Sequence, residues 1–342
     1  MPLTEVRPVQ TDSEWKRGRR EALALAACAL TVPLRAFAQA PAKPRRVGYV
    51  NSSNLATTSA WLKSFTGELR ARGWIDGQNL LLDMRFADGD ATRITPLLQE
   101  LLAQQPDVLV VGTDLVAKSA IALTRSVPVV FALGFDPVGL GVVKSLGRPG
   151  GNVTGISVLV YELTAKRVSV LRDAVPRLTR LGVFHHPANA DAVRNLDDLK
   201  KQLHGSGIAL TAVGITTAED AGPAFERLTK ARVQAVLMIP DPAYTRFRER
   251  LAELAIKHRL PSSYGNAPYV EAGALMAYAA DFPDAYRRTA IHVDKILNGT
   301  APASLPVEQA NVYELVVNQK TARALGMTLP QIFLLQVTKV LE

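Results

Sequence analysis

Polar side chains stand directly after the apolar runs of this chain, where they could hold a small molecule. Ligands of open parallel sheets sit outside the carboxyl ends of the strands, so residues at those ends are candidates for binding. The candidate ligand-binding residues are Asn51, Ser52, Thr113, Asp136 and Ser157 in the first half, and His186, Asp241, Tyr264, Tyr278 and Asp281 in the second half. Hydroxyls, amides, carboxylates and phenols in this mixture can bind a small polar or zwitterionic molecule, including one with an aromatic portion.

Many of these side chains have a structural interpretation as well. A Ser, Thr, Asp or Asn at the end of a strand can cap the following helix by accepting its free N–H groups. We expect capping by three residues, Ser53, Asp114 and Asn189. For Asp136, Asp241 and Asp281 capping and exposure to a ligand both stay open, because each lies next to a proline turn or just before a helix.

The familiar signatures of catalysis are absent from the sequence. It contains no Gly-x-Ser-x-Gly elbow, no paired-His zinc helix and no phosphate loop ending in Gly-Lys-Ser/Thr. Gly139-Leu140-Gly141 lacks the third glycine of a dinucleotide fingerprint. His185 and His186 are adjacent on a strand and point to opposite faces, so the two cannot chelate one ion. We therefore expect no cofactor, no metal and no enzymatic activity, with His186 either touching a ligand or capping the next helix.

The elements that must position these residues alternate between strand and helix. Strands are expected at 46–50, 80–86, 108–111, 127–133 and 152–157 in the first half, and at 181–184, 209–215, 235–239, 260–264 and 274–278 in the second, with a final strand at 314–317. Helices are expected at 57–72, 94–104, 138–146, 160–174, 189–204, 219–231, 243–258 and 282–297. This alternation favours parallel sheets with right-handed crossovers. Two five-stranded sheets, one in each half, fit the length of the chain.

The first 38 residues have the pattern of an export signal. A basic stretch at 16–20 precedes an apolar stretch at 22–34, and Ala36-Phe37-Ala38 is a small-x-small cleavage site. Roughly 20 apolar residues are needed to span a membrane, and this stretch is shorter. We therefore expect residues 1–38 to be a signal peptide and the mature protein to work in the periplasm. Arg19-Arg20 leaves Sec and twin-arginine export both open, and Leu25-Ala26-Ala27-Cys28 offers lipid anchoring at Cys28 as the less favoured alternative.

Composition narrows the function further. Residues 1–38 carry six basic and four acidic side chains, so the formal charge of +9 becomes +7 for the remaining 304 residues. Cys28 is the sole cysteine, so cleavage after Ala38 leaves a mature chain without disulfides or thiolate chemistry. The basic residues are scattered and only 6% of the chain is aromatic, whereas nucleic-acid binders gather both on one face. We expect no nucleic-acid partner.

Several longer motifs resemble one family. They are 136–140 (Asp-Pro-Val-Gly-Leu), 145–155 (Ser-Leu-Gly-Arg-Pro-Gly-Gly-Asn-Val-Thr-Gly), 239–242 (Ile-Pro-Asp-Pro), 273–278 (Gly-Ala-Leu-Met-Ala-Tyr), 286–288, 293–299, 305–309 and a closing helix over 318–329. In this order they resemble the substrate-binding proteins of ABC transporters of the tryptophan/tyrosine uptake type. The resemblance covers nearly all of the mature chain.

That resemblance implies a type I periplasmic-binding fold, an α/β architecture of two Rossmann-like lobes with parallel sheets joined by three crossings. The crossings would fall near 157–161, 278–282 and 307–314. Lobe I would comprise residues 44–158 plus 281–308, and lobe II residues 159–280 plus 309–342. Members close to the tryptophan binder recognise aromatic amino acids.

Three functions are consistent with the sequence. The first is a monomeric extracytoplasmic receptor that delivers a small polar or amino-acid-like ligand to an inner-membrane ABC permease with its ATPase. Export, paired α/β halves and the absence of catalytic motifs favour this function. The second is a periplasmic ligand-sensing module for a membrane signalling protein, which the same lobes could serve. The third, less favoured, is a periplasmic enzyme that uses Asp and His side chains of the cleft.

Overall fold

The computed structural model describes residues 43–158 and 160–342. Residues 44–342 form one compact unit. The expectations for a signal peptide at 1–38 and for Cys28 lie outside the described residues. In the part of the chain that the structure describes, no helix is both long and apolar enough to cross a membrane.

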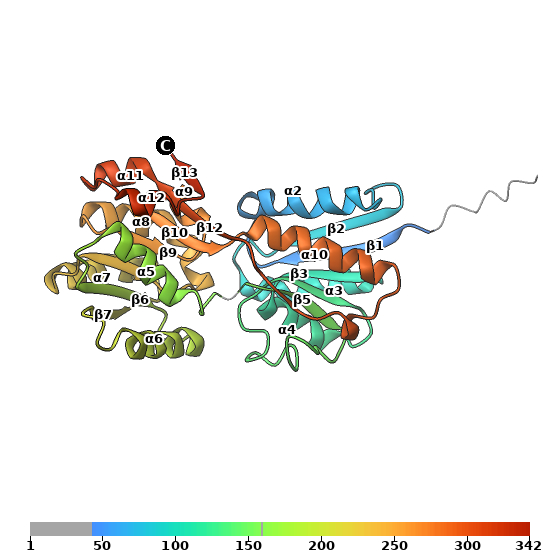
Figure 1. The fold of residues 1–342 in the computed structure, drawn as a ribbon. Helices are drawn as coiled ribbons and strands as arrows, with labels where there is room; N and C mark the ends of the chain where they lie inside the picture. The colour runs from blue at the N-terminus through green and yellow to red at the C-terminus, as the bar shows by residue number, and fades with distance from the viewer. Residues whose placement is uncertain (1–42, 159) are drawn as a thin grey trace, which may run out of the picture. The chain divides into compact units, whose positions relative to one another are not determined.

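The first sheet has six strands in the order β11-β5-β4-β3-β1-β2, and every neighbouring pair is parallel (Figure 1). The strands are β1 (Arg45–Asn51), β2 (Leu80–Phe86), β3 (Val108–Thr113), β4 (Val129–Gly134), β5 (Val153–Ser157) and β11 (Glu308–Gln309). The apolar run of β3 is buried on both faces of the sheet, as expected for a central parallel strand. Val108 and Val110 face one hydrophobic cluster, and Leu109 and Val111 face another.

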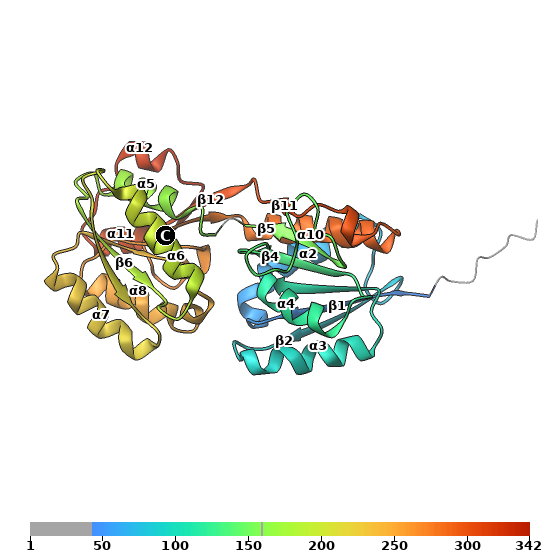
Figure 2. The same cartoon turned by 90° about the horizontal axis from the view of Figure 1, so that it is seen from below.

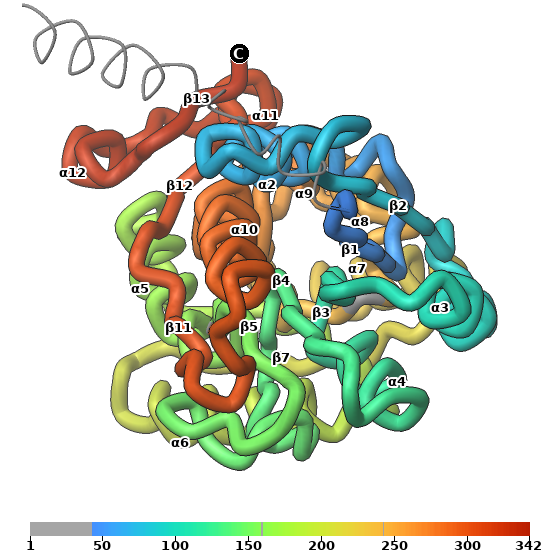
Figure 3. Tube along the Cα trace, turned by 90° about the vertical axis from the view of Figure 1, so that its right-hand side faces the viewer, coloured from blue at the N-terminus to red at the C-terminus, as the bar shows by residue number. Residues whose placement is uncertain are grey.

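Helices cover both faces of this sheet. The helical segments are α2 (Leu55–Ala71), η1 (Ala91–Arg93), α3 (Ile94–Ala103), α4 (Asp114–Leu123), α10 (Phe282–Leu297) and η3 (Pro302–Ser304). Residues of α2 and α10 build one cluster, and the two helices lie side by side (Figures 1 and 3). Residues of α3 and α4 build the cluster on the other face (Figure 2). We call this sheet with its helices lobe I.

The second sheet has seven strands in the order β13-β12-β10-β9-β8-β6-β7. The strands are β6 (Arg180–His185), β7 (Ala209–Gly214), β8 (Ala235–Met238), β9 (Ser262–Tyr264), β10 (Met276–Ala280), β12 (Tyr313–Asn318) and β13 (Lys339–Leu341). The helical segments are α5 (Thr164–Ala174), α6 (Ala190–Leu203), α7 (Ala218–Lys230), η2 (Pro242–Phe247), α8 (Arg248–Lys257), α9 (Ala267–Glu271), α11 (Gln319–Ala324) and α12 (Gln331–Leu334). All strand pairs are parallel except β10 with β12. We call this sheet with its helices lobe II.

The chain passes three times between the two sheets. It leaves β5 for α5 through residues 158–163, returns from β10 to α10 at Asp281, and runs from β11 to β12 through residues 310–312 (Figures 1 and 2). The α/β fold of two lobes joined by three crossings is therefore confirmed. The residue-level boundaries expected for the lobes stay a prediction.

Two expectations about local structure were wrong. The sheets have six and seven strands rather than five each, because β11 adds to the edge of the first sheet and β12 and β13 add to one edge of the second. The segment 138–146 forms turns instead of a helix. Its Gly141 has a φ of +69°, and the Gly139 N–H donates to the Asp136 side chain at 2.8 Å, which directs the backbone into a turn.

Candidate ligand-binding site

Asn51 is locked in place at the carboxyl end of β1. Its Nδ2 donates to the hydroxyls of Tyr49 at 2.6 Å and Tyr286 at 3.0 Å, and its Oδ1 accepts from the Ser53 N–H at 2.8 Å. Only 4% of Asn51 is exposed. The neighbouring strand carries Gly112 at the point of closest approach, where a Cβ would collide with the Asn51 amide. Asn51 thus organises the edge of lobe I through hydrogen bonds within the protein.

Thr113 and Asp114, at the end of β3, have roles that differ from those expected from the sequence. Thr113, rather than Asp114, caps α4 by accepting from the Val116 N–H. Asp114 instead accepts the backbone N–H groups of Phe135 at 2.8 Å and Asp136 at 2.7 Å. Burial raises the pKa of the Asp114 carboxyl to about 6, against the opposing effect of these N–H donors. Asp114 therefore fixes the loop after β4 on which Asp136 stands.

Asp136 is the carboxylate of lobe I that reaches toward lobe II. Its Oδ1 accepts from the Gly139 N–H, and its Oδ2 lies 3.9 Å from Nη2 of Arg194 on α6. A Cβ at Gly139 would collide with this carboxylate unless the Asp136 side chain moved. Arg194 also pairs with Asp191 on its own helix. The Asp136 side chain keeps 34% of its surface exposed and can accept further hydrogen bonds.

Two helix caps meet at the carboxyl edge of lobe II. Asn189 caps α6, as expected, by accepting from the N–H groups of Asp191 and Ala192. Asp241 caps η2 by accepting from the Ala243 N–H at 2.9 Å. Asn189 Nδ2 donates to Asp241 Oδ2 at 2.8 Å, which joins the two caps. Both oxygens of Asp241 thus have partners within the lobe.

The remaining polar candidates lie in varied surroundings. Ser53 was expected to cap α2, but Asn54 does so, with its side chain accepting from the Thr57 N–H. Ser52 is half-buried, and its carbonyl accepts from the Gly89 N–H at 2.7 Å. Ser157 is 3% exposed, and its carbonyl accepts from the Ala310 N–H at 2.7 Å. This backbone hydrogen bond joins the start of the first crossing to the third crossing.

The side chains of the histidine and tyrosine candidates pack against other aromatic rings of lobe II. The His186 ring lies 6.2 Å from the Tyr244 ring, and its Nδ1 is buried without a partner among the described residues. Tyr264 is 1% exposed, with its ring stacked on Tyr269 at 4.9 Å inside a hydrophobic cluster. The half-buried Tyr278 stacks on Tyr313 at 6.0 Å. Of these three, Tyr264 is an element of the core.

Asp281 acts as a cap at the second crossing. Its Oδ1 accepts from the Asp284 N–H at 3.0 Å at the start of α10. The Glu314 carboxyl on β12 is near enough for the charge of Asp281 to raise its pKa. Asp281 therefore lies in the second crossing with its carboxylate engaged by α10.

The sequence interpretation did not single out Tyr161, which lies in the first crossing. Burial raises the pKa of its phenol to about 12, and the carboxylates of Asp191, Asp241 and Asp114 act in the same direction. The phenol therefore lies within electrostatic reach of carboxylates from both lobes. No periodicity in the sequence marks Tyr161, because its importance comes from where the crossing places it.

Together these groups define a polar cluster, which comprises Asp136, Arg194, Asn189, Asp241 and Tyr161. It brings carboxylate acceptors for an ammonium group together with the guanidinium of Arg194. Such a mixture is suited to a zwitterion. Among the described residues, no group of three or more His, Cys, Asp or Glu side chains is arranged to hold a metal ion.

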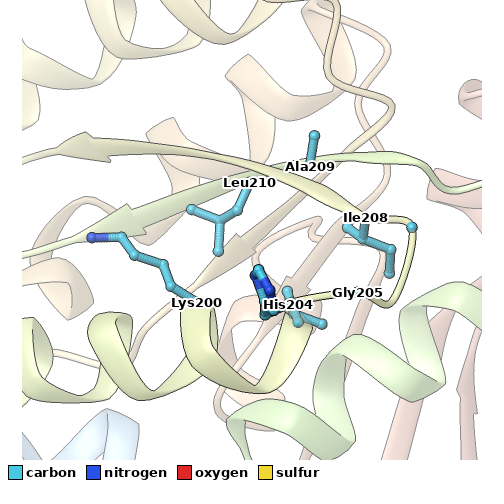
Figure 4. A pocket seen from close by; sticks show the side chains of 8 residues that line it. Lys200, His204, Gly205, Ile208, Ala209 and Leu210 are labelled. Atoms are coloured by element: carbon cyan, nitrogen blue, oxygen red, sulfur yellow. The ribbon is translucent and has the colours of Figure 1, made fainter.

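Surface pockets elsewhere contain none of the candidate residues. One is open and shallow, and lies between the end of α6 and the start of β7, with Lys200, His204 and Leu210 among its lining residues (Figure 4). It faces the amino end of β7, whereas the candidate residues follow the carboxyl ends of strands. Another lies over α2 and β2 and includes Lys63 and Trp74.

Comparisons with known proteins agree with this architecture. A family model described as ABC transporter substrate binding protein matches residues 57–341. A tyrosine-binding protein of Clostridioides difficile (strain R20291) is 23% identical over 265 residues, which cover 78% of this chain and 76% of that protein. A conserved domain protein from Vibrio cholerae O1 biovar El Tor has a TM-score of 0.78 at 28% identity, with 87% of this chain and 100% of that chain covered. An ABC domain from Streptococcus pneumoniae in complex with L-Trp has the same TM-score and coverage at 21% identity.

This chain belongs to the ABC transporter substrate-binding protein family. The family resemblance expected from the sequence is confirmed. Its members are substrate-binding proteins rather than enzymes, and they bind small ligands for delivery to an ABC permease.

Proposed function

We propose that this protein captures an amino-acid-like solute in the periplasm and delivers it to an inner-membrane ABC permease with its ATPase. The observation that carries the ligand class is the polar cluster, in which Asp136 of lobe I lies 3.9 Å from Arg194 of lobe II. Carboxylate and guanidinium groups near the carboxyl ends of parallel strands can bind the two charges of a zwitterion. The names of the related proteins, which refer to tyrosine and L-Trp, support the same class.

Within this proposal the candidate residues have two kinds of role. Ser52, Thr113, Asp136, Ser157, His186, Asp241 and Tyr278 would line the ligand or its approach. Asn51, Tyr264 and Asp281 would support the site, since their polar or aromatic groups already have contacts within the protein. Export through the signal at 1–38, cleavage after Ala38 and a monomeric state complete the proposal.

Binding of amino acids to the purified exported protein tests this function. A Tm increase or a calorimetric heat with any of the twenty common L-amino acids is the expected result, because a ligand that binds only the native state stabilises it. Asp136→Asn then tests the ammonium contact. Its Oδ1 still accepts from Gly139, so the substitution removes the charge and keeps the turn.

We expect Asp136→Asn to weaken binding by about tenfold or more, the equivalent of about 1.4 kcal/mol. Asp197→Asn is the matched control, because this exposed carboxylate on α6 pairs only with Lys200 at the surface. Absence of binding by the wild type would reject the ligand class. Equal affinities of Asp136→Asn and the control would reject the contact alone.

A further inference from the structure

Arg167 is a fully buried cation near the start of α5. None of its surface is exposed. Its Nε donates to the Tyr278 carbonyl at 2.8 Å, and its Nη1 donates to the Val160 carbonyl at 2.7 Å. Val160 lies in the first crossing and Tyr278 lies in β10, the strand that leads to the second crossing, so the guanidinium connects the first crossing to β10.

The guanidinium has unused hydrogen-bonding capacity. Arginine carries five N–H donors, two of which are engaged here, so three are left over. Nη2 has no hydrogen-bond partner among the described residues although it is buried. Buried donors in native proteins are nearly always satisfied, and one that is not calls for an explanation such as an absent ligand or water.

Its charge is likewise uncompensated. Within the described ranges Arg167 forms no salt bridge, and the acidic groups that act on it are the Tyr278 phenol and, after it, the Glu162 carboxylate. Burial lowers the pKa of the guanidinium to about 10, which still leaves it protonated at neutral pH. A buried charge without a counter-ion lowers the stability of the folded protein, so an anion that pairs with Arg167 would relieve this cost.

The free end of Arg167 lies at the carboxyl edge of the lobe II sheet. Gly265 directly follows β9, and a Cβ there would lie 3.8 Å from Nη2 and 2.5 Å from Cγ of Pro240, which follows β8. Gly265 and the Pro240 side chain therefore lie beside Nη2 at this edge. The edge is where open parallel sheets bind ligands.

We propose that Arg167 is the anion-binding residue of this receptor and pairs through Nη2 with the carboxylate of the ligand. The proposal rests on the function proposed above and specifies its ligand as a carboxylate. Nη2 is enclosed in this structure, so the carboxylate reaches it when the crossing segments shift. Nε and Nη1 of Arg167 bind β10 and the first crossing. A hinge movement at the crossings that admits a ligand therefore rearranges the surroundings of Nη2.

The proposed role of Arg167 is tested by comparing the affinity of the protein for an amino acid with its affinity for the corresponding amide, which lacks the carboxylate charge. Wild-type protein, Arg167→Gln and Arg167→Lys are titrated with the amino acid that binds and with the corresponding amino-acid amide. Arg172→Gln is the matched control, because Arg172 is an exposed residue of the same helix. Circular dichroism and Tm verify that each variant is folded, and the ratio of the two affinities is a readout that a purely structural role would not change.

The expected result is that wild type and Arg172→Gln prefer the acid over the amide by at least about 30-fold, as is typical of a buried charge pair. Arg167→Gln should lose this preference, and Arg167→Lys should retain part of it because it keeps the charge. A preference that persists in folded Arg167→Gln overturns the proposal and leaves the receptor function standing.

If the wild type binds no amino acid, the proposed function is rejected. A second experiment then tests the anion site at Arg167 independently of that function. Sodium acetate at up to about 100 mM is then the probe, with sodium chloride at equal ionic strength as the reference, since screening alone changes surface charge effects. A Tm increase specific to acetate in wild type and absent in Arg167→Gln would keep the anion site. An equal response of both proteins would overturn it.

Discussion

Asn189 Nδ2 donates to Asp241 Oδ2 at 2.8 Å, so the cap of α6 and the cap of η2 are one hydrogen-bonded unit. The backbone N–H groups of both helical segments depend on these two side chains. The Asp241 carboxylate also acts on the Tyr161 phenol of the first crossing, whose pKa is raised chiefly by burial. Removal of Asn189 should therefore affect both helical segments that the unit caps.

Asn189→Ala should lower the free energy of unfolding by about 1–3 kcal/mol, because it removes a helix cap and leaves Asp241 with one partner fewer. Asn189→Ser separates the two effects, since serine still caps a helix but does not reach Asp241. Urea unfolding should place Asn189→Ser between wild type and Asn189→Ala. Equal stability of the serine and alanine variants would show that capping by Asn189 contributes nothing.

Gly112→Ala should destabilise the protein by about 1–3 kcal/mol, because the added methyl group displaces the Asn51 amide from its bonds to Tyr49 and Tyr286. Gly67→Ala is the control. Gly67 is exposed within α2 with open space around it, so alanine there should stabilise the helix by up to about 1 kcal/mol. Chemical denaturation of both variants checks this prediction, and a Gly112→Ala protein as stable as wild type would contradict it.

Glu314 should make stability depend on pH. Burial raises the pKa of its carboxyl to about 7, and the negative charges of Asp281 and Glu271 act in the same direction, against Lys339. A carboxyl with a raised pKa in the folded state stabilises the protein below its unfolded pKa, and this contribution is lost as the pH rises through about 7. The Tm of wild type should therefore fall more between pH 5 and pH 8 than that of Glu314→Gln. Parallel Tm curves for the two proteins would refute this assignment.

Asp281→Asn should leave ligand affinity nearly unchanged. The carboxylate caps α10 through Asp284, and asparagine caps a helix about as well as aspartate. Calorimetry should find a change below about threefold, a difference under 1 kcal/mol. A larger loss would show that the Asp281 charge contacts the ammonium group of the ligand.

Much of the fold was predictable because buried parallel strands have a simple pattern. The unbroken apolar run of β3 and the helix that ends before Gly73 follow directly from residue types. The prediction of a helix at 138–146 was wrong because Leu140, Val143 and Leu146 have helical spacing, whereas Gly139 and Gly141 form turns. Local spacing carries no information on the tertiary contact between Gly139 and Asp136.

The candidate site was less predictable for a related reason. Strand ends could be located, but which side chains are already engaged depends on neighbours distant in sequence, as for Asn51 with Tyr286. Arg167 lies beside the exposed Lys166 on α5, and residue type alone does not distinguish the two. Only the carbonyls of Val160 and Tyr278 show that Arg167 is a buried cation at the hinge.

Native mass spectrometry of protein purified gently from the periplasm tests the central claim most directly. A receptor of this kind should carry one small molecule per chain, with both an amino and a carboxyl group, that is released on denaturation. Addition of that compound to the ligand-free protein should raise the Tm and, if the lobes close by hinge motion, reduce the radius of gyration. A bare-chain mass, together with no calorimetric heat from any common amino acid, would contradict the account.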